Sequence, residues 1–155
     1  MSRILIRHSC CAGAGDDMKQ EESKDFVTKE FAVNDDTVAL VTDFAEESMS
    51  EQDVPMKTIY AFNVVIDELV SNICNYSGAS EMSAGLYITE NDISMRFVDN
   101  GDPFDPEEIE DPDLALSVEE RGIGGLGIFM VRQMMDSFEY EYSDGKNISV
   151  IKKAR

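Results

Sequence analysis

The spacing of hydrophobic and polar positions predicts alternating strands and helices in the first half of the chain. Residues 25–33 are rich in strand-forming side chains, and residues 36–50 repeat apolar side chains at helical spacing. Between them, residues 34–36 are Asn, Asp and Asp, which favour a turn and a helix N-cap. Pro55 suits the start of a second, longer helix over residues 56–77.

The second half of the chain has a similar mixture. Residues 99–114 are rich in Pro, Asp and Gly and predict a loop, whereas residues 121–136 pass from a glycine-rich turn into a helix. Four segments in this half predict strands, over residues 85–89, 93–98, 138–142 and 147–153.

This order of elements predicts the fold class. Neighbouring strands joined by short turns pair mostly antiparallel, and helices grouped on one face give an α/β two-layer sandwich. We expect a mixed sheet of about five strands with three helices on one face, and the lack of short parallel βαβ units disfavours a doubly wound fold. Residues 24–155 form one domain in this interpretation, and residues 1–23 form a flexible or peripheral leader without helical or strand period.

Composition narrows the functional classes. The 155 residues carry a net charge of −19, so the surface repels nucleic acid but suits a basic protein partner. No apolar run approaches the roughly 18 residues of a membrane span, and the apolar part of the first residues is too short for a secretory signal. Cys10, Cys11 and Cys74 are too few and too oddly spaced for a disulfide framework or a metal site. We therefore expect a cytoplasmic protein.

The long helix carries a polar stripe beside its apolar face. Glu68, Asn72 and Asn75 share one arc at helical spacing, and no Lys or Arg lies anywhere between Thr58 and Met95. The stripe is either an exposed strip of the helix or one wall of a groove. A covered carboxylate without a basic partner is better explained by a groove that holds a ligand or a metal ion than by an exposed strip.

Asp99 ends a predicted strand within the sequence "FVDNGDPFD". The segment is either a plain Asn-Gly turn or a site whose carboxylate accepts a hydrogen bond from an exocyclic amine such as that of adenine. Gly101 would let a flat ring approach without a clash at Cβ.

A second glycine-rich segment, "RGIGGLGIFM", contains Gly122, Gly124, Gly125 and Gly127. These residues are either hinge and packing glycines or a phosphate-binding turn, since exposed amides at a helix start attract anions. The chain has no GxxxxGK[ST] pattern, which excludes a P-loop.

Together, these motifs resemble the nucleotide-binding domain of the GHKL superfamily (the Bergerat fold), which gyrase, Hsp90, histidine kinases and MutL share. "ELVSN" is similar to its N box, and "DNG" and "RGIGGLG" to its two glycine boxes. In order and spacing, "DELVSNICNY", "DNGDPFDP", "GGLGIFMVRQMMD" and "DGKNISVIKK" most resemble the stand-alone anti-sigma factor serine kinases, over about residues 24–153. Pro103, which replaces the second glycine of the histidine-kinase box, agrees with this subgroup.

The resemblance implies a role for each motif residue. Glu68 would be the general base, Asn72 the Mg²⁺ ligand, and Asp99 with Gly101 the adenine site. Gly122, Gly124, Gly125 and Gly127 would form the hinge and the phosphate contacts. Asn75 would lie next to the nucleotide, at a position where the family varies.

The same resemblance implies an activity and partners. The chain would be an ATP-dependent protein serine/threonine kinase that uses Mg²⁺, sequesters a sigma factor and phosphorylates a Ser of an anti-anti-sigma (STAS-like) antagonist, working as a homodimer without contacting nucleic acid or membrane. Two alternatives stay open. One is the catalytic domain of a histidine kinase, and the other is a non-catalytic ATP-binding switch module.

Overall fold

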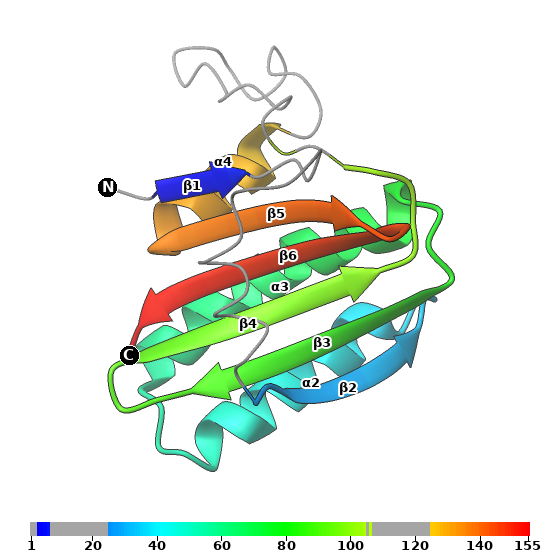
Figure 1. Cartoon of the computed structure of the whole chain (residues 1–155). Helices are drawn as coiled ribbons and strands as arrows, with labels where there is room; N and C mark the ends of the chain where they lie inside the picture. The colour runs from blue at the N-terminus through cyan, green and yellow to red at the C-terminus, as the bar shows by residue number, and fades with distance from the viewer. Residues whose placement is uncertain (1–2, 7–24, 105, 107–124) are drawn as a thin grey trace.

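One six-stranded sheet forms a layer of the structure, and three helices form the other layer over the described residues (Figure 1). The computed structural model describes residues 3–6, 25–104, 106 and 125–155. The strands are β1 (Arg3–Ile6), β2 (Val27–Ala32), β3 (Glu81–Ile88), β4 (Asp92–Asp99), β5 (Ser137–Ser143) and β6 (Lys146–Ala154). The helices are α2 (Thr37–Ser50), α3 (Met56–Tyr76) and α4 (Gly125–Met134).

The sheet has the order β1-β5-β6-β4-β3-β2 and is antiparallel except where β1 pairs with β5. In Figure 1, α2 lies behind β2 and β3, α3 behind the centre of the sheet, and α4 behind β5. The predicted two-layer α/β sandwich with helices on one face is therefore confirmed. The sheet has one strand more than expected, because β1 is a four-residue segment whose extended form depends on pairing with β5 rather than on its own pattern.

The start of α2 uses the predicted turn residues in a different way. Asp36 makes no side-chain capping hydrogen bond. Instead, the Thr37 hydroxyl accepts a hydrogen bond from the Asn34 N–H at 2.8 Å and donates one to the Ala32 carbonyl at 3.0 Å. Asn34 Oδ1 accepts from the Asp36 N–H at 2.9 Å, so the side chain of Asn34 holds the turn.

The core lies between α3 and the centre of the sheet. Phe62 and Ile66 of α3 are fully buried, as are Met95 and Phe97 of β4. Burying each such side chain stabilises the fold by about 1.5–3 kcal/mol. Side chains of a strand alternate between its two faces, so Asp99, two residues after Phe97, also points toward the helix layer. The same packing that builds the core thus places a carboxylate beneath α3.

The last helix is held against the sheet by its buried side and by its C-terminal end. Ile128 and Val131 of α4 are fully buried, and the ammonium of Lys153 on β6 donates to the Met134 carbonyl at 2.8 Å. A cation near the end of a helix also interacts favourably with the helix dipole. None of the helices in the described part of the chain is long and apolar enough to cross a membrane.

Candidate functional site

The polar stripe of α3 divides into a covered and an uncovered part. Glu68 and Asn72, one helical turn apart, are half-buried, whereas Asn75 is exposed. The Asn72 amide donates to Glu68 Oε1 at 3.1 Å. This bond uses the nitrogen end of Asn72, and no hydrogen bond to its Oδ1 is found among the described residues. An oxygen ligand is therefore left available beside a carboxylate.

The first turn of α4 packs directly on that carboxylate. A Cβ added to Gly127 would lie 1.8 Å from Glu68 Oε1 and 2.4 Å from Oε2, so any larger residue here would displace the carboxylate. The glycine at this position thus lets the backbone of α4 approach Glu68. The structure brings together the second glycine segment and the polar stripe, two motifs that are far apart in the sequence.

At the end of β4, Asp99 is fixed from two sides. Its side chain is only 5% exposed. Oδ1 accepts one hydrogen bond from the Gly101 N–H at 2.9 Å and another from the Asn147 amide at 3.0 Å. Within the described residues, Oδ2 receives no hydrogen bond.

The loop after Asp99 is clamped onto the end of α3. The Asp102 N–H donates to the Ser77 carbonyl at 2.7 Å, and Asn100 Oδ1 accepts from the N–H groups of Ser80 and Glu81 at 2.9 and 3.1 Å. A Cβ on Gly101 would lie 2.5–2.6 Å from atoms of Ser77, one of them the backbone oxygen. Gly101 is thus required for this close approach.

Asn147 is a site residue that the sequence analysis missed. It is 3% exposed, and its amide nitrogen donates to Asp99, to the Gly101 carbonyl at 3.3 Å and to the Asp102 carbonyl at 2.9 Å. Its Oδ1 accepts from the Tyr140 hydroxyl at 2.7 Å and from the Phe104 N–H at 3.1 Å. Asn147 lies within the segment "DGKNISVIKK", but what joins it to the site is its position opposite Asp99 in the β4–β6 pairing, which the sequence alone does not reveal.

A cavity of about 290 Å³ lies between α3 and the helix-facing side of the sheet, and Asn72, Asp99 and Asn147 all line it. Its walls are mainly apolar, from residues such as Leu69, Ile73, Phe97 and Phe104, and its polar lining includes Asn72, Asp99 and Asn147. An apolar slot with a few fixed polar groups is the usual form of a small-molecule site.

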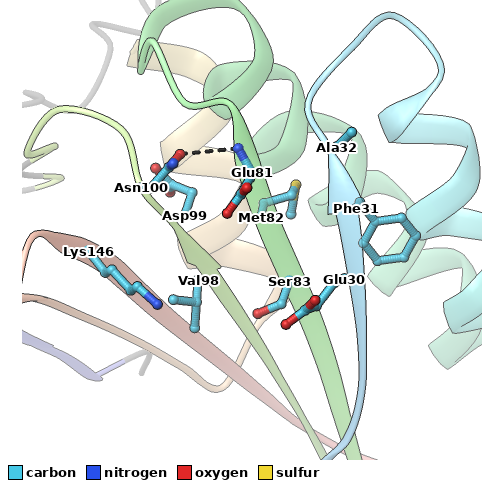
Figure 2. A pocket seen from close by; sticks show the side chains of 10 residues that line it. All are labelled: Glu30, Phe31, Ala32, Glu81, Met82, Ser83, Val98, Asp99, Asn100 and Lys146. Atoms are coloured by element: carbon cyan, nitrogen blue, oxygen red, sulfur yellow. Dashed lines mark hydrogen bonds between the residues drawn. The ribbon is translucent and has the colours of Figure 1, made fainter.

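A second cavity of about 320 Å³ lies over the strand ends, where Asp99 and Asn100 also contribute. Figure 2 shows its lining, with Lys146, Val98, Ser83 and Glu30 on adjacent strands. This cavity is slightly larger, but Asn72 does not line it, whereas Asn72 and Asp99 both line the cavity beside α3. Glu68 lines neither cavity and is connected to the one beside α3 through its hydrogen bond with Asn72. We therefore take the cavity beside α3 as the candidate site.

The remaining predicted site residues lie elsewhere. Gly125 begins α4, whereas Gly122 and Gly124 lie outside the described residues. Asn75 does not line the cavity beside α3.

Burial raises the pKa of the Cys74 thiol, which favours its uncharged form.

Comparison of the sequence with protein-family models identifies the family of this chain. A family model of the histidine kinase-like ATPase domain matches residues 31–153. The chain belongs to this family. The match includes Glu68, Asn72, Asp99, Gly127 and Asn147, and membership implies a kinase-like domain that uses ATP.

Two curated relatives are named as kinases. The serine/threonine-protein kinase BtrW of Bordetella bronchiseptica is 27% identical over 92 residues, which cover 57% of this chain and 65% of that protein. The serine-protein kinase RsbW of Listeria monocytogenes is 27% identical over 104 residues, which cover 62% of this chain and 66% of that protein. The chain thus aligns with slightly less than two thirds of each relative.

Two solved structures share the fold. The RsbU and RsbW domains of a Mycobacterium tuberculosis protein match with a TM-score of 0.59 and 11% identity, over 83% of this chain and 33% of that one. A chain of the SiaB-SiaC complex from Pseudomonas aeruginosa matches with a TM-score of 0.53 and 11% identity, over 90% of this chain and 98% of that one. The Bergerat fold that the motifs predicted is therefore confirmed.

Proposed function

We propose that this chain is an ATP-dependent protein serine/threonine kinase whose substrate site is the cavity beside α3. The observation that supports this most is the position of Asn72. It lines the cavity together with Asp99 and also hydrogen-bonds Glu68, so one residue connects the base-binding end to the carboxylate. A nucleotide with its base at Asp99 would then extend its phosphates toward Glu68 and α4.

Glu68 is the proposed general base. A Ser or Thr hydroxyl attacks the γ-phosphorus of ATP, its proton passes to the Glu68 carboxylate, and ADP leaves. A positioned base of this kind contributes about 10²- to 10⁴-fold to the rate. Glu68 is only half-buried, which keeps it reachable for a protein substrate, while the Asn72 amide and the first turn of α4 contact its carboxylate.

The residues fit a magnesium ion held mainly by the nucleotide. The described part of the chain has no group of three or more His, Cys, Asp or Glu side chains that could hold a metal by themselves. Asn72 Oδ1 is an oxygen ligand of the kind that Mg²⁺ prefers, and Mg²⁺ commonly binds through one or two protein groups plus substrate phosphates. When bound, the ion would neutralise phosphate charge during transfer.

For the partners, we propose an anti-anti-sigma (STAS-like) protein as the phosphorylated substrate and a sigma factor as the sequestered protein. The kinase names of the two relatives and the motif resemblance to anti-sigma factor kinases support this proposal. The net charge of −19 suits basic surfaces on such partners. We also propose that the protein is cytoplasmic and works as a homodimer.

The test uses the full chain, ATP labelled in its γ-phosphate, and antagonist proteins captured with this chain from its native cells. We expect label on Ser or Thr of one captured protein. Glu68→Gln, which keeps the size of the side chain, should retain ATP binding and lower transfer by about 10²- to 10⁴-fold.

Two other outcomes would reject the kinase assignment. Label recovered as acid-labile phosphohistidine would indicate a histidine kinase. ATP binding without transfer to any captured protein would indicate a switch module.

A further inference from the structure

The side chain of Asn147 has a fixed orientation because its two ends face opposite kinds of group. Its nitrogen meets three acceptors, on Asp99, Gly101 and Asp102, and its oxygen meets two donors, on Tyr140 and Phe104. A rotation of the amide by half a turn would place its oxygen against the three acceptors and its nitrogen against the Phe104 N–H, and only the Tyr140 hydroxyl could adapt by accepting instead of donating. Asn147 therefore holds one orientation, and buried networks satisfied in this way are rigid.

This orientation determines which atom Asp99 presents to the cavity. Asn147 and the Gly101 N–H both donate to Oδ1. With Oδ1 engaged, Oδ2 is the acceptor of Asp99 that stays available to a ligand in the cavity. An unprotonated carboxylate oxygen accepts a hydrogen bond from an amine and repels a carbonyl.

We propose that Asn147 is a positioning residue that sets base specificity, by holding Asp99 so that Oδ2 faces a 6-amino purine. This inference rests on the proposed ATP site. It adds a residue from β6 that touches neither the phosphates nor the metal ligand and selects the base through Asp99.

The hydrogen bonds of Asn147 allow its effect on Asp99 to be tested separately from its contribution to the stability of the fold. In Asn147→Asp, a carboxylate oxygen can still accept from Tyr140 and Phe104, so that half of the network survives. The other half loses its donor and gains a negative charge next to Asp99 and two carbonyl oxygens. The substitution thus disturbs the direction of Asp99 while changing the volume of the side chain very little.

The experiment compares the dissociation constants of ATP and purine riboside 5′-triphosphate, which lacks only the 6-amino group. For the unchanged chain we expect about a 10- to 100-fold preference for ATP, the usual effect of a hydrogen bond to a charged group. In Asn147→Asp this preference should fall to about threefold or less. Asn147→Ser is neutral and too short to reach Asp99, so it should also lower the preference for ATP. It replaces the Asp variant in the experiment if that variant does not fold.

Asn91→Asp is the matched control, because Asn91 is exposed in the turn before β4, at the far end of that strand from Asp99. It should leave the preference unchanged. Equal weakening of both nucleotides in the Asn147 variants, with the preference preserved, would overturn the inference and leave a purely structural role. Failure of the unchanged chain to bind ATP would instead overturn the proposed function.

Discussion

The two ends of the candidate site are built in different ways. At the end proposed to bind the base (the base end), Asp99 and Asn147 are almost fully buried and share a network of hydrogen bonds that includes Tyr140. At the end proposed to bind the phosphates (the phosphate end), Glu68 and Asn72 are half-buried and share one hydrogen bond. One end is thus held by many hydrogen bonds and is almost fully buried, and the other is held by the one hydrogen bond between Glu68 and Asn72 and is closer to solvent.

This difference matches what each end must do. A base is recognised by a fixed pattern of donors and acceptors, which a rigid network can hold in place before binding. Phosphoryl transfer needs an oxygen ligand for the metal ion and an acceptor for the proton of the incoming hydroxyl, so both groups must have atoms available when the nucleotide and the substrate bind. Substitutions at the base end should therefore change selectivity, and substitutions at the phosphate end should change rate.

Gly127→Ala should have the largest effect. The new methyl group would overlap the Glu68 carboxylate, which must move away from the start of α4. We expect transfer to fall by about 10²- to 10⁴-fold, as for loss of the base, with ATP affinity nearly retained. Transfer rates at saturating ATP and calorimetric titration of ATP would measure the two quantities.

A double-mutant cycle separates this contact from a general defect of the helix. Alanine favours a helix over glycine by about 1 kcal/mol, so the substitution should stabilise α4 once the clash is gone. In a Glu68→Ala background, Gly127→Ala should therefore raise the unfolding free energy. A Gly127→Ala chain that transfers phosphate within twofold of the unchanged rate would contradict the assignment of Glu68.

Asp99→Asn should alter selectivity at the base end. The oxygen of the new amide can still accept from Gly101 and Asn147, which leaves its nitrogen facing the cavity as a donor. We expect the ratio of ATP to inosine triphosphate affinity to shift by roughly 100-fold toward inosine, whose 6-oxo group accepts a hydrogen bond.

Asp67→Asn provides the charge control for this prediction, since Asp67 is exposed on the outer side of α3. Its ratio of affinities should equal that of the unchanged chain. If the ratio of ATP to inosine triphosphate affinity were unaltered in Asp99→Asn, the assignment of Asp99 to adenine would be rejected. The roles proposed for the phosphate end would not be affected by that result.

The contact between Glu68 and Asn72 was predictable from sequence largely because both residues lie on one helix. Glu68 and Asn72 are four residues apart, so helical geometry alone brings them together, and the absence of a nearby cation indicated an unusual carboxylate. Asp99 was also predictable, because it ends a strand that alternates toward the core.

The network around Asp99 was not predictable in the same way. Asn147 meets it only through the register of β4 with β6, and Tyr140 enters through the register of β5 with β6. A shift of either register by one residue would turn these side chains to the other face of the sheet. The strand β1 was missed for a related reason, since its four residues carry little pattern of their own and take their form from β5.

Asn72→Ala should have a smaller effect, confined to binding that depends on magnesium. The substitution removes the Oδ1 ligand, and we expect ATP affinity in the presence of Mg²⁺ to fall about tenfold. Affinity measured with a chelator should change little. Asn75→Ala is the matched control, because Asn75 is an exposed amide on the same helix and does not line the cavity. Equal loss with and without Mg²⁺ would reject Asn72 as a metal ligand.

Tyr140→Phe should have the smallest effect, although it removes a hydroxyl from the buried network. That hydroxyl donates to Asn147 Oδ1 and accepts from the Phe104 N–H, yet these two groups also bond to each other at 3.1 Å. Since neither is left without a partner, we expect a loss of about 0.5–1.5 kcal/mol in unfolding free energy.

Base preference should survive this change, because the bonds from Asn147 to Asp99, Gly101 and Asp102 do not involve Tyr140. Urea unfolding would measure the stability, and titration with ATP and purine riboside 5′-triphosphate would measure the preference. A preference that collapses in Tyr140→Phe would mean that Asn147 takes its direction mainly from the tyrosine. The rigidity of the base end would then depend on the β5–β6 hairpin rather than on the loop that follows Asp99.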